Sequence, residues 1–320
     1  MQAEDSNNDN QSSAQQARKY RLAWLAIIIT IGVASLSIRL LMRYDFDNSA
    51  LLYVGIPFLI SLAIVVFRPL SRREKWWHAY RDRAYIALII FLSSSIVLFE
   101  GFVCVLMFMP IYFFVVSIGF LISWYTHTRS ARSGKMYVSI LPLLILASSI
   151  EGTTEFLSFD RESHVTVTKT ASLSRDQILR NLAQPIDLQK DRGWLMSVFP
   201  MPYRIEAESL NPGDIHRVYT RYHHWFITNT HEGEMHLQIV DVQPNRIKTR
   251  FVHDSTYFAS YLTAIGTEIS LVATGPGETE ISLRIDYERK LDPAWYFHPL
   301  EQIGVSQMAS LLIDEVMIRE

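Results

Sequence analysis

Residues 277–302, GETEISLRIDYERKLDPAWYFHPLEQ, contain the two patterns that decide the fold of this chain. Apolar and polar side chains alternate over residues 280–288, which predicts a strand with one buried face. Residues 293–320 have helical apolar spacing and predict a long terminal helix. We expect its buried stripe to comprise Leu300, Gly304, Met308, Leu311, Leu312 and Glu315, with Gly304 allowing a close approach.

Five further strands precede this one, and Pro- or Gly-containing turns separate several of them. The six predicted strands cover residues 203–210, 214–228, 235–242, 246–253, 268–274 and 280–288. The turns at residues 211–214 (NPGD), 243–245 (QPN) and 275–277 (GPG) favour antiparallel connections. Six successive antiparallel strands predict a strongly curved sheet, whose concave face the terminal helix would cover.

Upstream, one strand and two helices are expected. Residues 164–169 (HVTVTK) alternate as a strand. Ser174 followed three residues later by Gln177 matches a capping box, so a helix should begin there and end before Pro185. Residues 186–196 are interpreted as a second helix.

The alternation also predicts which side chains face the space between sheet and helix. On the last strand these are Ile281, Leu283, Ile285 and Tyr287; on residues 246–253 they are Ile247, Thr249, Phe251 and His253; and on residues 235–242 they are Met235, Leu237 and Ile239. A mostly apolar wall with a few polar groups suits a hydrophobic ligand. The candidate ligand-binding residues are Thr249, Phe251, His253, Leu283, Ile285 and Tyr287. A solid core is the alternative.

Three segments carry a resemblance to a known superfamily. They are VTVTKTASLSRDQILRNL, IVDVQPNRIKTRFVHD and GETEISLRIDYERKLDPAWYFHPLEQ. The order of strands and helices in residues 160–320 resembles the START-related helix-grip (SRPBCC) superfamily, which includes polyketide cyclase-like and lipid-transport domains. The resemblance implies an α+β domain with a curved antiparallel sheet around a long C-terminal helix. It implies a fold rather than one activity.

The first half of the chain has a different character, because five apolar segments occupy it. The predicted membrane spans are about residues 22–41, 50–67, two spans within 84–125, and 136–150. The domain plan is therefore a polar, disordered tail (1–20), a transmembrane helical domain (21–150), a linker (151–162) and the START-related domain (163–320). A cleaved signal peptide is the alternative for the first span.

Charge predicts the orientation of these spans. Lys and Arg cluster before span one, between spans two and three, and between spans four and five, which places those segments in the cytoplasm. The N-terminus would then be cytoplasmic and the C-terminal domain periplasmic or extracellular, in a multi-pass protein of the cell (inner) membrane. Trp76, Trp77, Tyr80, Trp124 and Tyr125 fit an interfacial aromatic belt.

The turn between spans three and four has two candidate positions. Glu100-Gly101 combines charge with backbone freedom, and Pro110 is the alternative. If the turn is at Pro110, Glu100 would lie within the membrane and would become a candidate functional residue.

Composition and motifs limit the possible functions. The net charge of −2 argues against nucleic acid as a general partner, and the single cysteine cannot form an intramolecular disulfide. Signatures for serine hydrolases, phosphate loops, zinc proteases and dinucleotide binding are missing from the sequence. The histidines of residues 216–236 lack metal-ligand spacing, so neither metal nor cofactor is expected. His224 or His253 could act as an acid–base group, although no carboxylate partner can be assigned.

These observations lead to three functional hypotheses. The first is membrane-anchored binding or transport of a hydrophobic small molecule or lipid. The second is a cyclase- or hydratase-like enzyme that uses a cavity His or Tyr. The third is a non-catalytic interaction module of an envelope complex.

Overall fold

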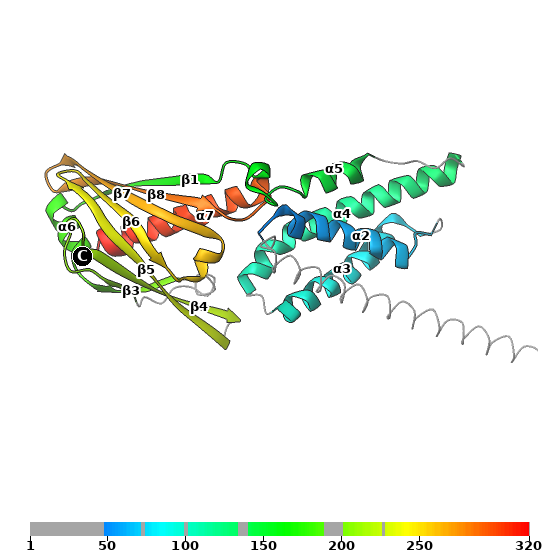
Figure 1. Cartoon of the computed structure of the whole chain (residues 1–320), viewed down its shortest axis with the longest axis horizontal. Coiled ribbons are helices and arrows are strands. Elements are labelled where there is room, and N and C mark those ends of the chain that lie inside the picture. Colours follow the sequence, from blue (N-terminus) through cyan, green and yellow to red (C-terminus); the bar gives the residue numbers. More distant parts are fainter. Residues whose placement is uncertain are drawn as a thin grey trace, which may run out of the picture. The chain divides into compact units, whose positions relative to one another are not determined.

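The computed structural model describes residues 48–71, 74–98, 102–133, 140–188, 201–225 and 228–319. They divide into two compact units, a helical unit that ends at Leu157 and a sheet-containing unit that begins at Ser158 (Figure 1). This boundary lies within the predicted linker, where the apolar segments give way to alternation.

The helical unit contains the predicted apolar segments that the structure describes. Its elements are η1 (Leu51–Gly55), α2 (Ile56–Phe67), α3 (Trp76–Leu98), α4 (Phe102–Ser133), α5 (Leu141–Ser148) and η2 (Glu155–Leu157). Within the described ranges, one helical segment, Val105–Arg129, has the length and composition needed to cross a membrane, and Leu51–Phe67 is apolar but shorter.

The five-span bundle therefore stays a prediction. The first span lies outside the described residues, as do Glu100 and Gly101. Residues 140–150 of the fifth span are described, and α5 occupies 8 of them. The alternative turn at Pro110 is wrong, because α4 continues through that residue.

In the described residues, the second unit is an eight-stranded antiparallel sheet with the α-helices α6 and α7. Its elements are β1 (Glu162–Ala171), α6 (Arg175–Leu182), β2 (Ile186–Asp187), β3 (Met201–Glu206), β4 (Ile215–Trp225), β5 (Thr228–Gln243), β6 (Arg246–Asp254), η4 (Tyr257–Ser260), β7 (Leu262–Gly275), β8 (Glu278–Arg289), α7 (Ala294–Leu312) and η5 (Ile313–Met317). The strand order is β1-β8-β7-β6-β5-β4-β3-β2. The six long predicted strands and the first strand are all present.

Between residues 162 and 188 the local signals behave as the sequence indicates, with one exception. The backbone N–H of Ser174 donates to Oε1 of Gln177 at 2.9 Å, so the predicted cap is present at the start of α6. The exception is the second helix, because Ile186 and Asp187 pair with β3 as a short strand. Residues 189–196, the rest of that prediction, lie outside the described ranges.

Helix α7 lies against the concave side of the curved sheet (Figure 1). The core of the unit joins Ile281, Leu283 and Ile285 of β8 to Ala309 and Ile313 at the C-terminal end of this helical segment. Burying apolar area of this kind stabilises a fold by about 25 cal/mol per Å².

The predicted stripe on this helix is wrong in phase. The buried positions follow Phe297, Glu301, Ala309 and Ile313, whereas Gly304 is exposed and no atom lies within 4 Å of a Cβ built on it. The observed buried positions lie about one residue away from the predicted ones, which corresponds to a rotation of the helix by roughly 100°. Close approach of the helix and sheet does not depend on Gly304.

Two glycines of this unit give a test of the packing. Gly304→Ala should raise the free energy of unfolding by about 0.5–1 kcal/mol, because alanine favours a helix and its methyl group meets nothing. Gly233→Ala should lower it, because the new Cβ would lie 2.5 Å from the backbone oxygen of Ser255. Hydrogen exchange of the sheet amides in the full-length chain measures both changes. Equal effects of the two substitutions would contradict this packing.

Candidate ligand site on the inner face of the sheet

The inner face of β8 forms the first wall of the candidate site. Ile281, Leu283, Ile285 and Tyr287 are all buried, with exposed fractions between 0% and 8%. Alternate residues of this strand have more exposure, in a regular pattern along β8. The predicted inward direction of Leu283, Ile285 and Tyr287 is therefore confirmed, whereas their role in ligand binding stays a prediction.

A row of residues continues this wall across the neighbouring strands. Ile285 pairs with Thr267 of β7, Thr267 pairs with Thr249 of β6, and Thr249 pairs with Ile239 of β5. The two threonine hydroxyls lie 2.8 Å apart and share a hydrogen bond. Thr249 is thus on the predicted face, and Phe251 is half-buried two residues further along β6.

His253 lies on the opposite face from the one predicted. The register shifts between Leu237 and His236 of β5, so that Phe251 pairs with Leu237 and His253 pairs with His236. The extra residue, Val252, is a β-bulge, and it reverses the alternation beyond it. His253 is exposed, and its ring centroid lies 4.9 Å from that of His236. This arrangement removes His253 from the inner wall and from the acid–base hypothesis.

The inner face ends in buried polar side chains where β8 leads into α7. Tyr287, Arg289 and Glu301 are 0%, 1% and 7% exposed. The Tyr287 hydroxyl, Arg289 Nη2 and both Glu301 carboxyl oxygens are buried without a hydrogen-bond partner among the described residues. Buried polar atoms are normally paired, so four such atoms in one region need an explanation.

One carboxylate, Asp292, holds this region together. Arg289 Nη1 donates to Asp292 Oδ1 at 2.5 Å and also to the backbone oxygen of Leu291. Arg161, which precedes β1, donates to the other carboxylate oxygen at 2.9 Å. Asp292 is completely buried. Two guanidinium groups therefore share one carboxylate.

Burial also changes the titration of Glu301 and Tyr287. Desolvation raises the pKa of Glu301 to about 8; Arg289 opposes this shift, and Asp292 adds to it. Desolvation likewise raises the pKa of Tyr287, and the nearby Ser163 hydroxyl and the Arg289 charge oppose this shift. Near neutral pH, both groups carry protons and can donate hydrogen bonds.

Sequence reasoning missed Arg289, Asp292 and Glu301. Arg289 continues the inward alternation of β8 after Tyr287, so that pattern could have identified it. Glu301 follows the buried Phe297 by one helical turn, and only the packing of α7 shows that this face is inward. A charged residue at an inward position is unusual, so a pattern search assigns it to solvent.

The remaining histidines do not form a second site in the described residues. His216 Nε2 lies 2.7 Å from the backbone oxygen of Ser209, and His231 Nε2 lies 3.2 Å from that of Ser255. The side chains of His223 and His224 lie outside the described part. The described ranges contain no cluster of metal-ligating side chains.

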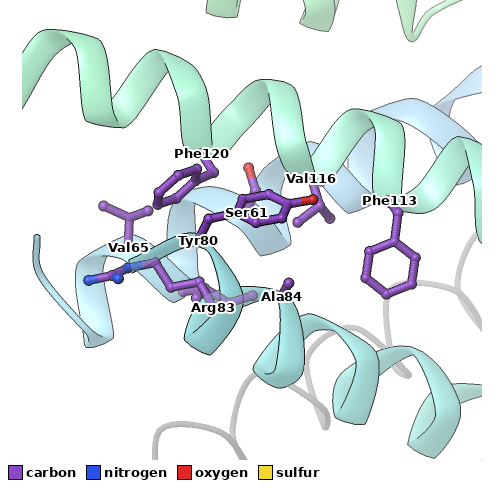
Figure 2. A pocket seen from close by; sticks show the side chains of 9 residues that line it. Ser61, Val65, Tyr80, Arg83, Ala84, Phe113, Val116 and Phe120 are labelled. Carbon is purple, nitrogen blue, oxygen red and sulfur yellow. The ribbon is translucent and has the colours of Figure 1, made fainter. Parts of the chain in front are cut away.

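The helical unit contains a small hollow of about 10 Å³, lined by residues of α2, α3 and α4 (Figure 2). Its polar groups already have protein partners. Tyr80 shares a hydrogen bond with Ser117, and Arg83 donates to the backbone oxygens of Arg68 and Pro69. A volume of this size is about that of one water molecule, so it does not suit an organic ligand.

The strand order and the enclosed helix define the C-terminal fold. It is a helix-grip domain.

The chain matches no protein-family model and no curated protein. It is similar to several solved structures. These include truncated norcoclaurine synthase from Thalictrum flavum (TM-score 0.32, 14% identity, covering 51% of this chain and 99% of that chain).

Two other solved structures have similar scores. The Zhui aromatase/cyclase from Streptomyces sp. R1128 has a TM-score of 0.31 and 16% identity, covering 49% of this chain and 92% of that chain. A START superfamily protein from Mycobacterium smegmatis has a TM-score of 0.27 and 16% identity, covering 46% of this chain and 95% of that chain. At these scores the likenesses carry no argument about ligand or chemistry, and the fold assignment rests on the observed topology.

Substitution of Glu301 should change how stability depends on pH. The folded state keeps the Glu301 proton up to about pH 8, whereas an unfolded chain loses it near 4.5, so unfolding releases a proton between these values. This carboxyl therefore makes stability fall with rising pH by up to roughly 1.4 kcal/mol per pH unit. Glu301→Gln should remove that slope.

Hydrogen exchange of the β8 amides, compared between variant and parent at each pH, measures this effect. The advantage of Glu301→Gln should grow from pH 5 to pH 8 and then level off. Asp314→Asn is a matched control, because Asp314 is an exposed carboxylate on η5. A constant difference for Glu301→Gln across this range would show that Glu301 is ionised in the fold.

Proposed function

We propose that this chain is a membrane-anchored protein whose helix-grip domain binds a hydrophobic small molecule or lipid. The observation that carries the proposal is the inner face of β8, which is apolar from Ile281 to Ile285 and ends in buried polar atoms without partners. Ligand sites of proteins combine apolar walls with a few polar groups that set the ligand's orientation. The ligand's apolar part would lie along Thr249, Phe251, Leu283 and Ile285.

Anchoring by several spans belongs to the same proposal. Its support is the apolar segment Val105–Arg129, the shorter apolar segment Leu51–Phe67, and the Lys/Arg clusters that alternate between the predicted spans. The same charge pattern favours a domain outside the cytoplasm. An anchor would keep the domain close to a source of hydrophobic ligands.

Adjacent residues on opposite faces of β6 test the ligand site. Thr249 faces inward and Arg250 is exposed, so Thr249→Phe adds a ring to the inner face and Arg250→Phe adds the same ring outside. Native mass spectrometry of the full-length chain from detergent should detect bound apolar molecules on the parent and on Arg250→Phe. Occupancy should fall several-fold in Thr249→Phe. Equal occupancy in both variants would remove the inner face from the proposal.

The orientation has a separate test, because it depends on the number of spans. Alkaline phosphatase fused after Glu320 should be active, since this enzyme matures only outside the cytoplasm. Green fluorescent protein fused at the same position should give little signal, since it becomes fluorescent only when it folds in the cytoplasm. The opposite result would mean that an even number of spans, such as four, precedes the domain.

A further inference from the structure

The polar end of the inner face contains several buried hydrogen-bonding atoms from three side chains. Arg289 Nη2 and the Tyr287 hydroxyl are buried and unpartnered in the described structure, and so are both oxygens of Glu301. These three side chains are each more than nine-tenths buried. Tyr287 and Arg289 come from the last two inward positions of β8, and Glu301 comes from the second turn of α7.

We propose that Tyr287, Arg289 and Glu301 bind the carboxylate of a hydrophobic carboxylic acid whose apolar tail lies along the inner face of the sheet. The inference rests on the proposed function, and it names the ligand's class. The carboxylate would accept hydrogen bonds from Arg289 Nη2, from the Tyr287 hydroxyl and from the protonated Glu301. Hydrogen bonds to a charged acceptor are about twice as strong as neutral ones.

The charge of the region favours a single negative charge on the ligand. Arg161 and Arg289 share Asp292, so two positive groups face one negative group. With Glu301 protonated, one positive charge is left uncompensated. The Arg161 side chain is 28% exposed, so water solvates part of this excess, whereas Arg289 is buried. A monoanionic carboxylate beside Arg289 would complete the neutralisation of the buried charge. A neutral amide would leave that charge in place, and a phosphate dianion would exceed it.

The protonation of Glu301 also sets the pH range for binding. Its raised pKa, about 8, keeps it a donor near neutral pH. The other titratable or polar groups of this region come from four parts of the chain: Arg161 and Ser163 at the start of β1, Tyr287 and Arg289 of β8, Asp292 of the turn, and His298 of α7. The Nδ1 atom of His298 lies 3.5 Å from Ser163 Oγ. Above pH 8, an ionised Glu301 would repel a carboxylate.

Octanoate and octanamide are probes that differ in charge but share the same tail. The experiment is equilibrium dialysis of each radiolabelled probe at pH 7 against the full-length chain in lipid nanodiscs, with empty nanodiscs subtracted. Octanoate should bind at one site per chain, and octanamide at least tenfold more weakly. Octyl phosphate should also bind more weakly than octanoate. At pH 9, octanoate binding should fall several-fold.

Four variants connect the binding to the named side chains. Tyr287→Phe removes one donor and should weaken octanoate binding by about tenfold. Glu301→Gln keeps a donor, so it should bind octanoate at pH 7 and lose the fall at pH 9. Arg289→Met should abolish the preference for octanoate, and Arg284→Met, on the exposed face of the same strand, should keep it. If Arg289→Met does not fold, Tyr287→Phe and Glu301→Gln still test whether these side chains bind the carboxylate.

The outcomes separate this inference from the proposed function. Equal binding of octanoate and octanamide to the inner face would overturn carboxylate recognition and leave hydrophobic binding in place. Octanoate could also bind preferentially in the parent while Tyr287→Phe and Glu301→Gln leave this binding unchanged at both pH values. That result would overturn the inference too, because other side chains would then bind the carboxylate. If neither octanoate nor octanamide binds and the purified chain carries no apolar molecule, both the inference and the proposed function fail.

Discussion

The buried ion pair between Arg289 and Asp292 is the interaction on which the helix-grip domain depends most. It links the end of β8 to the turn that begins α7, and Arg161 extends it to the entry of β1. These groups lie where the chain leaves the sheet and begins the helix that covers it. Removing one member of a buried pair typically costs about 3–5 kcal/mol, because the other charge stays buried without a partner. The direction of the helix relative to the sheet is tied to this contact.

The same contact gives the inner face its chemical asymmetry. Toward the C-terminal end of α7, the sheet and helix meet through apolar side chains such as Leu283 and Ile313. Toward the start of α7, they meet through Tyr287, Arg289 and Glu301, whose remaining polar atoms lack partners in the described structure. An amphipathic molecule has the same asymmetry. The inner face of the domain and the proposed ligand therefore match, because each is apolar along most of its length and polar at one end.

Sequence patterns predicted much of the fold because the relevant signals are local. Alternation along β8 placed Leu283, Ile285 and Tyr287 on the inner face, and the Ser174–Gln177 cap located α6. The errors arose where one residue changes the phase. The bulge at Val252 turned His253 outward, and the buried face of α7 includes the charged residue Glu301, one position away from the expected stripe. A bulge and a buried charge are stabilised by neighbours distant in sequence, so periodicity does not report them.

By itself, the sequence determined the class of the C-terminal domain, because side-chain alternation, turn residues and helical spacing act over a few residues. It also determined the charge pattern from which an orientation can be proposed. Only the tertiary structure decided which polar side chains share the inner face. Arg161, Arg289, Asp292 and Glu301 come from separate parts of the chain, and the pKa of Glu301 depends on its burial and on the charges of Arg289 and Asp292. Those quantities exist only once the sheet has closed on its helix.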